Sequence, residues 1–210
     1  MTNPDLPAEW SAGQPEATLI LLHGLGASGD DLYGLAEALQ LENVRFLLPD
    51  APLRPISMYE GYPMRAWFDL AGLDAGAQQD SFGLDQARAQ VAAWIARENR
   101  RGIATPRIAL AGFSQGAALA LYSGLTLNLP LAGVAGLSGW LPRLTPATIT
   151  PSVWTAHGEW DTVVPLSLSL ASYAQQPQLG ITPHVWPIGH EICAEEIVAL
   201  RDWLRTTAWI

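Results

Sequence analysis

The sequence contains no lysine, and all eleven of its basic residues are arginine. A chain without lysine cannot form a Schiff base, a Ser-Lys dyad or the lysine-bearing phosphate loop of P-loop nucleotidases. The single cysteine excludes an internal disulfide framework and a zinc site built on several thiolates. Enzyme classes that depend on these groups are therefore excluded.

Basic charge and long apolar runs are also scarce. Twenty acidic residues against eleven basic ones give a formal net charge of -9, without a basic run, which argues against nucleic acid or an anionic membrane surface as partner. No apolar run reaches the ~18 residues of a membrane span. The first residues lack the basic and then apolar pattern of a secretory signal. We expect a cytoplasmic protein, monomeric or homodimeric, without a membrane span.

Short apolar runs alternate with helical patterns along the chain. Runs of strand length occur at residues 17–22, 44–48, 108–111, 131–137, 153–156 and 184–186. Helical periodicity covers residues 30–40, 80–100, 115–125 and 191–205, and Pro165 begins a further helix. This alternation predicts an α/β fold with a mostly parallel central sheet and helices on both faces. We expect one domain over residues 1–210, in which the aperiodic, Gly- and Pro-rich segment 50–80 is a functional loop or lid.

The first glycine cluster fits a dinucleotide-binding fingerprint. Residues 24–29 (GLGASG) have the G-x-G-x-x-G pattern, follow a strand and precede a helix. Asp50 ends the next strand, roughly 20 residues on, where a ribose-binding acid would lie. Asp30 and Asp31, however, begin the helix whose N-terminus would hold the pyrophosphate, so like charges would meet. A dinucleotide-binding oxidoreductase is therefore the weaker alternative.

The second glycine motif predicts a nucleophilic serine. Gly112-Phe113-Ser114-Gln115-Gly116 fits G-x-S-x-G between a buried strand and a helix of small residues, where a sharp turn projects the serine hydroxyl away from the sheet. Such a serine needs a base and an acid that orients the base. Asp161 and His190 each follow a later strand, and the order serine, aspartate, histidine is that of the α/β-hydrolases.

A hydrolase also needs backbone N–H donors for the oxyanion. The residue after the nucleophile, Gln115, supplies one, and the loop after an early strand supplies the other through Leu25. This gives the first glycine cluster a second explanation. His23 then braces that loop through hydrogen bonds, and Asp50 and Asp69 make structural loop hydrogen bonds. The pair Glu195-Glu196 is typical of a solvated helix face.

Seven sequence blocks carry a family resemblance over nearly the whole chain. They are LLHGLGASGDD, LLPDAP, MRAWFD, GFSQGAALA, LSGWLP, HGEWDTVVP and GHEI. Together they resemble the carboxylesterase and acyl-protein thioesterase (phospholipase/carboxylesterase) family of α/β-hydrolases, with ASGDD closer to bacterial carboxylesterases. The resemblance implies the α/β-hydrolase fold and no metal or organic cofactor.

The resemblance also assigns roles to individual residues. It implies Ser114 as nucleophile, His190 as base, Asp161 as orienting acid, and Leu25 and Gln115 as the oxyanion hole. It implies that segment 50–80 covers the active site and that four apolar side chains wall the acyl site. These four are Trp67, Leu73, Trp140 and Val164.

We therefore expect a serine hydrolase that acts through an acyl-enzyme. Its expected substrates are carboxylic esters with short to medium acyl chains, small molecules or acyl esters, with thioesters as a further class. The remaining alternative is a binding protein of the same fold that retains the three residues without turnover.

Overall fold

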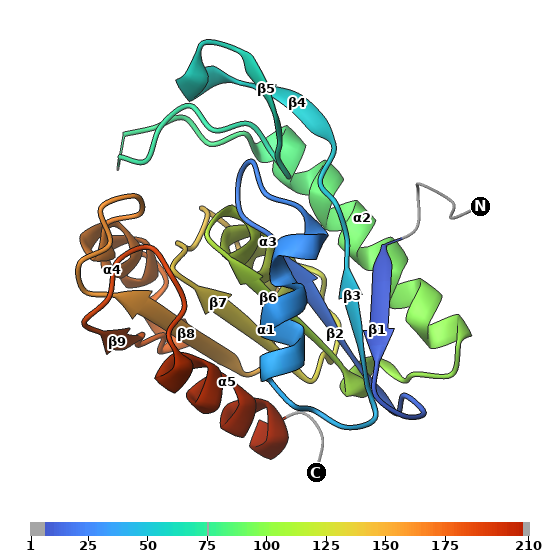
Figure 1. Ribbon diagram of the computed structural model, residues 1–210. Coiled ribbons are helices and arrows are strands. Elements are labelled where there is room, and N and C mark those ends of the chain that lie inside the picture. The colour runs from blue at the N-terminus through green and yellow to red at the C-terminus, as the bar shows by residue number, and fades with distance from the viewer. Residues whose placement is uncertain (1–6, 75, 208–210) are drawn as a thin grey trace.

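The computed structural model describes residues 7–74 and 76–207. In this part of the chain a central seven-stranded sheet has the order β1-β3-β2-β6-β7-β8-β9 (Figure 1). Strand β1 is antiparallel to β3, and the other neighbours are parallel. The strands are Ala8–Ser11 (β1), Ala17–Leu22 (β2), Val44–Leu48 (β3), Ile108–Phe113 (β6), Gly133–Leu137 (β7), Val153–Gly158 (β8) and His184–Trp186 (β9).

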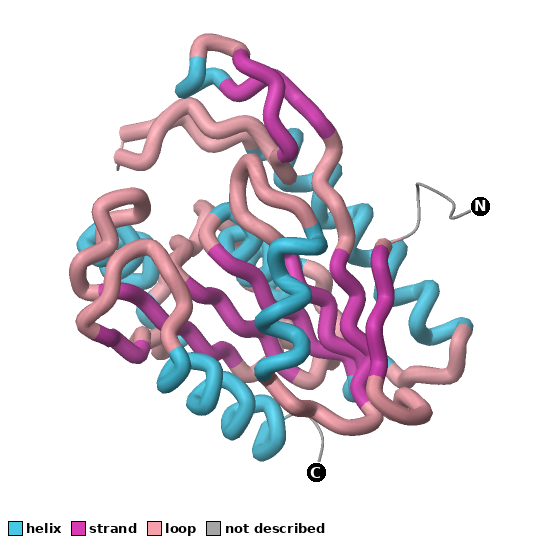
Figure 2. The backbone as a smooth tube through the Cα atoms, viewed as in Figure 1, coloured by secondary structure: helices cyan, strands magenta, loops and turns pink. Residues whose placement is uncertain are grey.

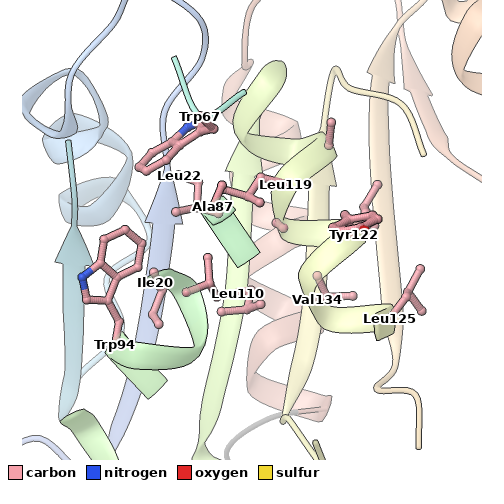
Figure 3. Close-up of a cluster of buried hydrophobic side chains, with 14 of the residues drawn as sticks. Ile20, Leu22, Trp67, Ala87, Trp94, Leu110, Leu119, Tyr122, Leu125 and Val134 are labelled. Carbon is pink, nitrogen blue, oxygen red and sulfur yellow. The ribbon is translucent and has the colours of Figure 1, made fainter. Parts of the chain in front are cut away.

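Helices cover both faces of this sheet. The α-helices are Tyr33–Ala38 (α1), Ser81–Arg100 (α2), Gln115–Thr126 (α3), Leu166–Ala174 (α4) and Ala194–Thr207 (α5). Short 3-10 helices are Gly29–Leu32 (η1), Ser57–Tyr59 (η2), Thr105–Arg107 (η3) and Pro177–Leu179 (η4). Successive side chains of a strand point to opposite faces, so Ile20 and Leu22 pack with α2 and α3 (Figure 3), whereas Leu19 and Leu21 pack with α1 and α5.

The sequence prediction of a mostly parallel sheet between helices is confirmed. Helix α2 begins where predicted because the Asp80 carboxylate accepts the backbone N–H of Gly83 at 2.8 Å. Helix α5 was predicted to begin at Glu191 but begins at Ala194, so residues 191–193 belong to the preceding loop. The short edge strand β1 was missed, because it lacks a continuous apolar run.

Segment 50–80 contains a β-hairpin that the sequence pattern did not predict. Leu53–Ile56 (β4) pairs antiparallel with Tyr62–Arg65 (β5), and η2 lies between them. Pro55 is directly opposite Pro63, which a two-stranded ribbon tolerates but which obscures the strand pattern in the sequence. The hairpin and the loop after it project beyond one end of the central sheet (Figures 1 and 2).

No helix in the described ranges is long and apolar enough to cross a membrane.

Candidate active site

Ser114 occupies a strained turn between β6 and α3. Its backbone has φ 56° and ψ -119°, a combination that costs a non-glycine residue roughly 1–3 kcal/mol. The surrounding glycines permit the turn: a Cβ on Gly116 would lie 2.0 Å from the carbonyl oxygen of Leu22, and one on Gly112 would lie 2.2 Å from the carbonyl carbon of Gly116. The tight contacts hold the serine at the carboxyl end of the sheet, as the sequence motif predicts.

Asp161 and His190 are joined by a hydrogen bond. His190 Nδ1 lies 2.7 Å from Asp161 Oδ2 and donates to it, since the carboxylate only accepts. The other carboxylate oxygen accepts the backbone N–H groups of Val163 and Val164 at 2.9 and 2.8 Å. Asp161 is buried, whereas His190 is partly exposed and packs on the Phe113 ring, with 4.7 Å between centroids. This arrangement fixes the tautomer of His190 and leaves its Nε2 free to accept a proton.

Backbone contacts bring the acid and base loops together. A Cβ on Gly158, at the end of β8, would lie 2.2 Å from the carbonyl oxygen of Gly189, so only glycine allows this approach. The N–H of Trp160 donates to the carbonyl oxygen of Ile188 at 2.9 Å. The position of His190 therefore depends on the end of β8 as well as on its own loop.

Ser114 and His190 line one cavity of about 490 Å³. Leu25, Gln115, Leu73, Trp140 and Val164 line the same cavity, and the roles that the resemblance implies for them stay predictions. The further apolar lining includes Leu32, Met58, Tyr59, Met64, Leu70, Phe113, Val163 and Ile192. A largely apolar cavity that contains a serine and a histidine suits an uncharged acyl chain with its carbonyl at the serine.

The predicted role of Trp67 as a cavity wall is wrong. Trp67 is only 2% exposed and belongs to the hydrophobic core beside Leu22 (Figure 3); it is absent from the described residues that line the cavity. Its indole Nε1 donates to the carbonyl oxygen of His23 at 2.8 Å. Within the MRAWFD block, Trp67 therefore braces the loop that begins at His23, because its buried indole finds a hydrogen-bond partner in that backbone.

The side chain of Gln115 connects the serine turn to the same block. Its Oε1 accepts the N–H of Trp67 at 3.0 Å, and its Nε2 donates to the carbonyl oxygen of Phe68 at 2.8 Å. The sequence motif predicted a role only for the backbone N–H of this residue and gave no indication of these contacts. The signal in the sequence was the glutamine itself, whose polar side chain needs hydrogen-bond partners once the fold buries it.

His23 braces the glycine loop, as predicted. Its Nε2 accepts the N–H of Ala51 at 2.9 Å, so its Nδ1 carries the proton and donates to the carbonyl oxygen of Gly24 at 2.7 Å. Burial lowers the pKa of His23, which keeps the ring neutral. Both ring nitrogens are occupied, and the ring has no free nitrogen to act as a base.

Asp50 is occupied within the loop as well. It accepts the N–H of Gly29 at 2.8 Å and pairs with Arg65 at 3.2 Å. The carboxylate of Asp50 therefore binds the glycine loop and Arg65 at the place where the dinucleotide-binding interpretation requires it to bind a ribose, which contradicts that interpretation. Within the described ranges, no group of three or more His, Cys, Asp or Glu side chains is arranged to hold a metal ion.

The hairpin supplies cavity residues that the sequence pattern did not identify. Met58 and Tyr59 come from η2, and Met64 comes from β5. They lie in the aperiodic segment 50–80, where the composition indicated a functional loop but not which side chains face the cavity.

Comparison with known proteins agrees with this geometry. The family model described as Phospholipase/Carboxylesterase matches residues 8–208. The chain belongs to the phospholipase/carboxylesterase family.

Individual members of the family are similar over nearly their whole length. Acyl-protein thioesterase 1 of Mycosarcoma maydis is 36% identical over 93% of this chain and 92% of its own. Acyl-protein thioesterase 1 of Neurospora crassa is 34% identical over 90% and 85%. The crystal structure of Zea mays acyl-protein thioesterase 2 is 30% identical, covers 96% of this chain and 98% of its own, and has a TM-score of 0.86.

Proposed function

We propose that the protein is a serine hydrolase that cleaves carboxylic esters, and thioesters, with short to medium acyl chains through an acyl-enzyme. The observation that carries the proposal is the single cavity that contains Ser114 in its strained turn and His190 bonded to buried Asp161. The acyl-protein thioesterases among the relatives support the extension to thioesters.

In the proposed mechanism, Ser114 Oγ attacks the acyl carbon while His190 Nε2 takes the hydroxyl proton. The Asp161 carboxylate stabilises the imidazolium through the 2.7 Å bond to Nδ1. The backbone N–H groups of Leu25 and Gln115 stabilise the oxyanion. His190 then gives its proton to the leaving group and activates the water that hydrolyses the acyl-enzyme.

The remaining parts of the proposal concern the surroundings of this site. We propose that segment 50–80 acts as a lid, supported by the cavity positions of Met58, Met64 and Leu73. A single domain over residues 1–210, a monomeric or homodimeric state, a cytoplasmic location and the absence of nucleic-acid partners remain predictions. The single cysteine and the net charge of -9 support the last two.

Replacing Ser114 with Ala tests the proposal. The change should abolish both turnover of p-nitrophenyl butyrate and covalent labelling by a fluorophosphonate, because only an activated serine reacts with that probe. Stopped assays of hydrolysis and mass spectrometry of the labelled chain measure the two effects. Turnover above one tenth of the original rate would overturn the assignment of Ser114.

Asp161→Asn tests the proposed role of the acid. It should lower kcat by roughly 10⁴-fold without unfolding the protein, since the amide favours the wrong His190 tautomer. A wild-type protein that neither hydrolyses esters nor reacts with the probe would instead support the non-enzymatic binding protein.

A further inference from the structure

A second buried histidine lies next to the proposed acid. His157, near the end of β8, is fully buried and is not among the described residues that line the cavity. Its Nε2 lies 2.8 Å from the carbonyl oxygen of Val164 and 3.4 Å from Asp161 Oδ2. A carbonyl oxygen only accepts hydrogen bonds, so Nε2 carries a proton. The positive end of this N–H group therefore lies close to Asp161 Oδ2, the oxygen that also holds His190.

The other side of the ring contacts α4. Its Nδ1 lies 3.2 Å from Ser169 Oγ, and the same hydroxyl hydrogen-bonds the carbonyl oxygen of Gly139. Gly139 packs beneath the serine turn, where an added Cβ would lie 2.8 Å from the carbonyl oxygen of Ser114. The ring therefore lies between the acid loop, where Nε2–H donates to the Val164 carbonyl, and α4, where Nδ1 lies beside the Ser169 hydroxyl. It cannot rotate away from Asp161 without losing the hydrogen bond to Val164.

The charged environment of His157 is simple. Among the described groups, Asp161 and His190 act on it electrostatically, whereas α4 contributes the Ser169 hydroxyl and the segment before Trp140 contributes the Gly139 carbonyl. Burial lowers the pKa of His157, so the ring is neutral at pH 7 and acts through its N–H dipole.

We propose that His157 is a positioning residue that sets the strength of the interaction between Asp161 and His190. The inference rests on the proposed function. The Nε2–H group draws negative charge toward itself on Asp161 Oδ2 and thereby weakens the stabilisation of protonated His190. It also holds the Val164 carbonyl, and through it the 161–164 loop whose N–H groups bind the other oxygen of Asp161. Removing this donor leaves more negative charge on Asp161 Oδ2 and strengthens its interaction with the imidazolium, so the acid limb of the pH–rate profile moves to higher pH.

Three substitutions separate this role from simple packing. Glutamine can place its amide nitrogen where His157 Nε2 lies and keep the donor, whereas asparagine reaches only the Nδ1 position and leucine has no donor. The measurement is the pH midpoint of the acid limb of kcat/KM with p-nitrophenyl butyrate, together with the pH profile of fluorophosphonate labelling. We expect His157→Asn and His157→Leu to raise the midpoint by about 0.5 units, which lowers kcat/KM about threefold at pH values below it. His157→Gln should keep the original midpoint.

An unchanged midpoint in folded Asn and Leu variants would overturn the proposal, as would an equal shift in the Gln variant. A purely structural role lowers thermal stability in all three without moving the midpoint. Nitrogen-15 spectra of the wild-type histidine rings add a test that needs no variant: at pH 7 His157 must carry its proton on Nε2, and the Nδ1 tautomer would overturn the proposal. Wild-type labelling that depends on Ser114 keeps a failure here distinct from a failure of the proposed function.

Discussion

Glu196 lies at a buried position, where the ionised form of a carboxyl group is unfavourable. It lies in the first turn of α5, is fully buried, and neither side-chain oxygen has a hydrogen-bond partner among the described residues. Burial raises the pKa of Glu196 to about 7, against a smaller opposite effect of the nearby Cys193 backbone N–H. The sequence interpretation of Glu195-Glu196 as a solvated face is therefore wrong for Glu196.

The raised pKa makes stability depend on pH. Between pH 4.5, where glutamate ordinarily titrates, and pH 7, the folded chain retains a proton that the unfolded chain has lost. The free energy of unfolding therefore falls as the pH rises through this range, by about 3 kcal/mol in total.

Glu196→Gln should remove this loss because the amide cannot ionise. At pH 8 the variant should melt about 5–10 °C above the wild type, and at pH 5, where most of the loss has not yet occurred, the difference should be no more than about 2–3 °C. Calorimetry or circular dichroism at both pH values measures the difference. Glu195→Gln, at the exposed neighbouring position, is the control: its pKa is lowered by hydrogen bonds, so the carboxylate is ionised at both pH values and any change in melting temperature should be the same at pH 5 and pH 8. A Glu196→Gln variant that is no more stable than the wild type at pH 8 would show that ionisation of Glu196 does not destabilise the folded protein.

The elements themselves were largely predictable from the sequence. Strand β2 has the expected limits because its continuous apolar run is buried along its whole length. Strands β3 and β9 also have the expected limits, although Arg45 interrupts the apolar run of β3 and β9 is mostly exposed. Helix α2 has its cap and its buried stripe where the 3.6-residue period indicates.

What the sequence could not provide was contact between distant elements. Trp67 is a large apolar residue of the kind that often lines a cavity. Its position, however, is set by hydrogen bonds with Gln115 and His23, which lie far from it in the chain. The position of His157 is also set by distant segments. Its ring faces Asp161 because the end of β8, α4 and the acid loop come together in the fold. Local patterns identify elements and the order of the reactive residues, whereas long-range packing determines which faces meet.

The junction between β8 and the His190 loop provides a test at the scale of elements. In Gly158→Ala, the added methyl group would lie 2.2 Å from the carbonyl oxygen of Gly189 and 2.5 Å from that of Ile188, so the loop must move. A displacement of about 1 Å in a catalytic group costs on the order of 10²-fold in rate, and we expect kcat/KM for p-nitrophenyl butyrate to fall by about 10–100-fold.

Gly34→Ala provides the control for this change. A Cβ on Gly34 meets nothing within 4 Å, and the residue lies in α1. Alanine should stabilise the helix by about 0.5–1 kcal/mol and leave the activity unchanged. Equal activities of the two variants would show that the approach of β8 does not position His190.

At the scale of the whole molecule, distant segments enclose two adjacent cavities. The cavity with Ser114 and a smaller one of about 150 Å³ share Leu70, Leu73 and Trp140 as lining residues. Segment 50–80 contributes the two leucines, and the loop after β7 contributes the tryptophan. The smaller cavity is also lined by polar groups such as Gln79, Arg143 and Ser172. If an acyl chain lies in the larger cavity, as proposed, the boundary between the cavities limits the apolar length available to it.

Trp140→Ala should open this boundary and shift the substrate preference toward longer acyl chains. If the indole blocks two methylene groups, their burial is worth about 0.8 kcal/mol each, so the ratio of kcat/KM for p-nitrophenyl octanoate to that for the butyrate should rise roughly tenfold. The ratio is the appropriate measure, because loss of a large side chain also lowers stability and affects both substrates alike. Trp160→Ala, at an exposed position outside the described lining of both cavities, should leave the ratio unchanged. A Trp140→Ala ratio equal to that of the wild type would place the end of the acyl site elsewhere, against Leu70 and Leu73.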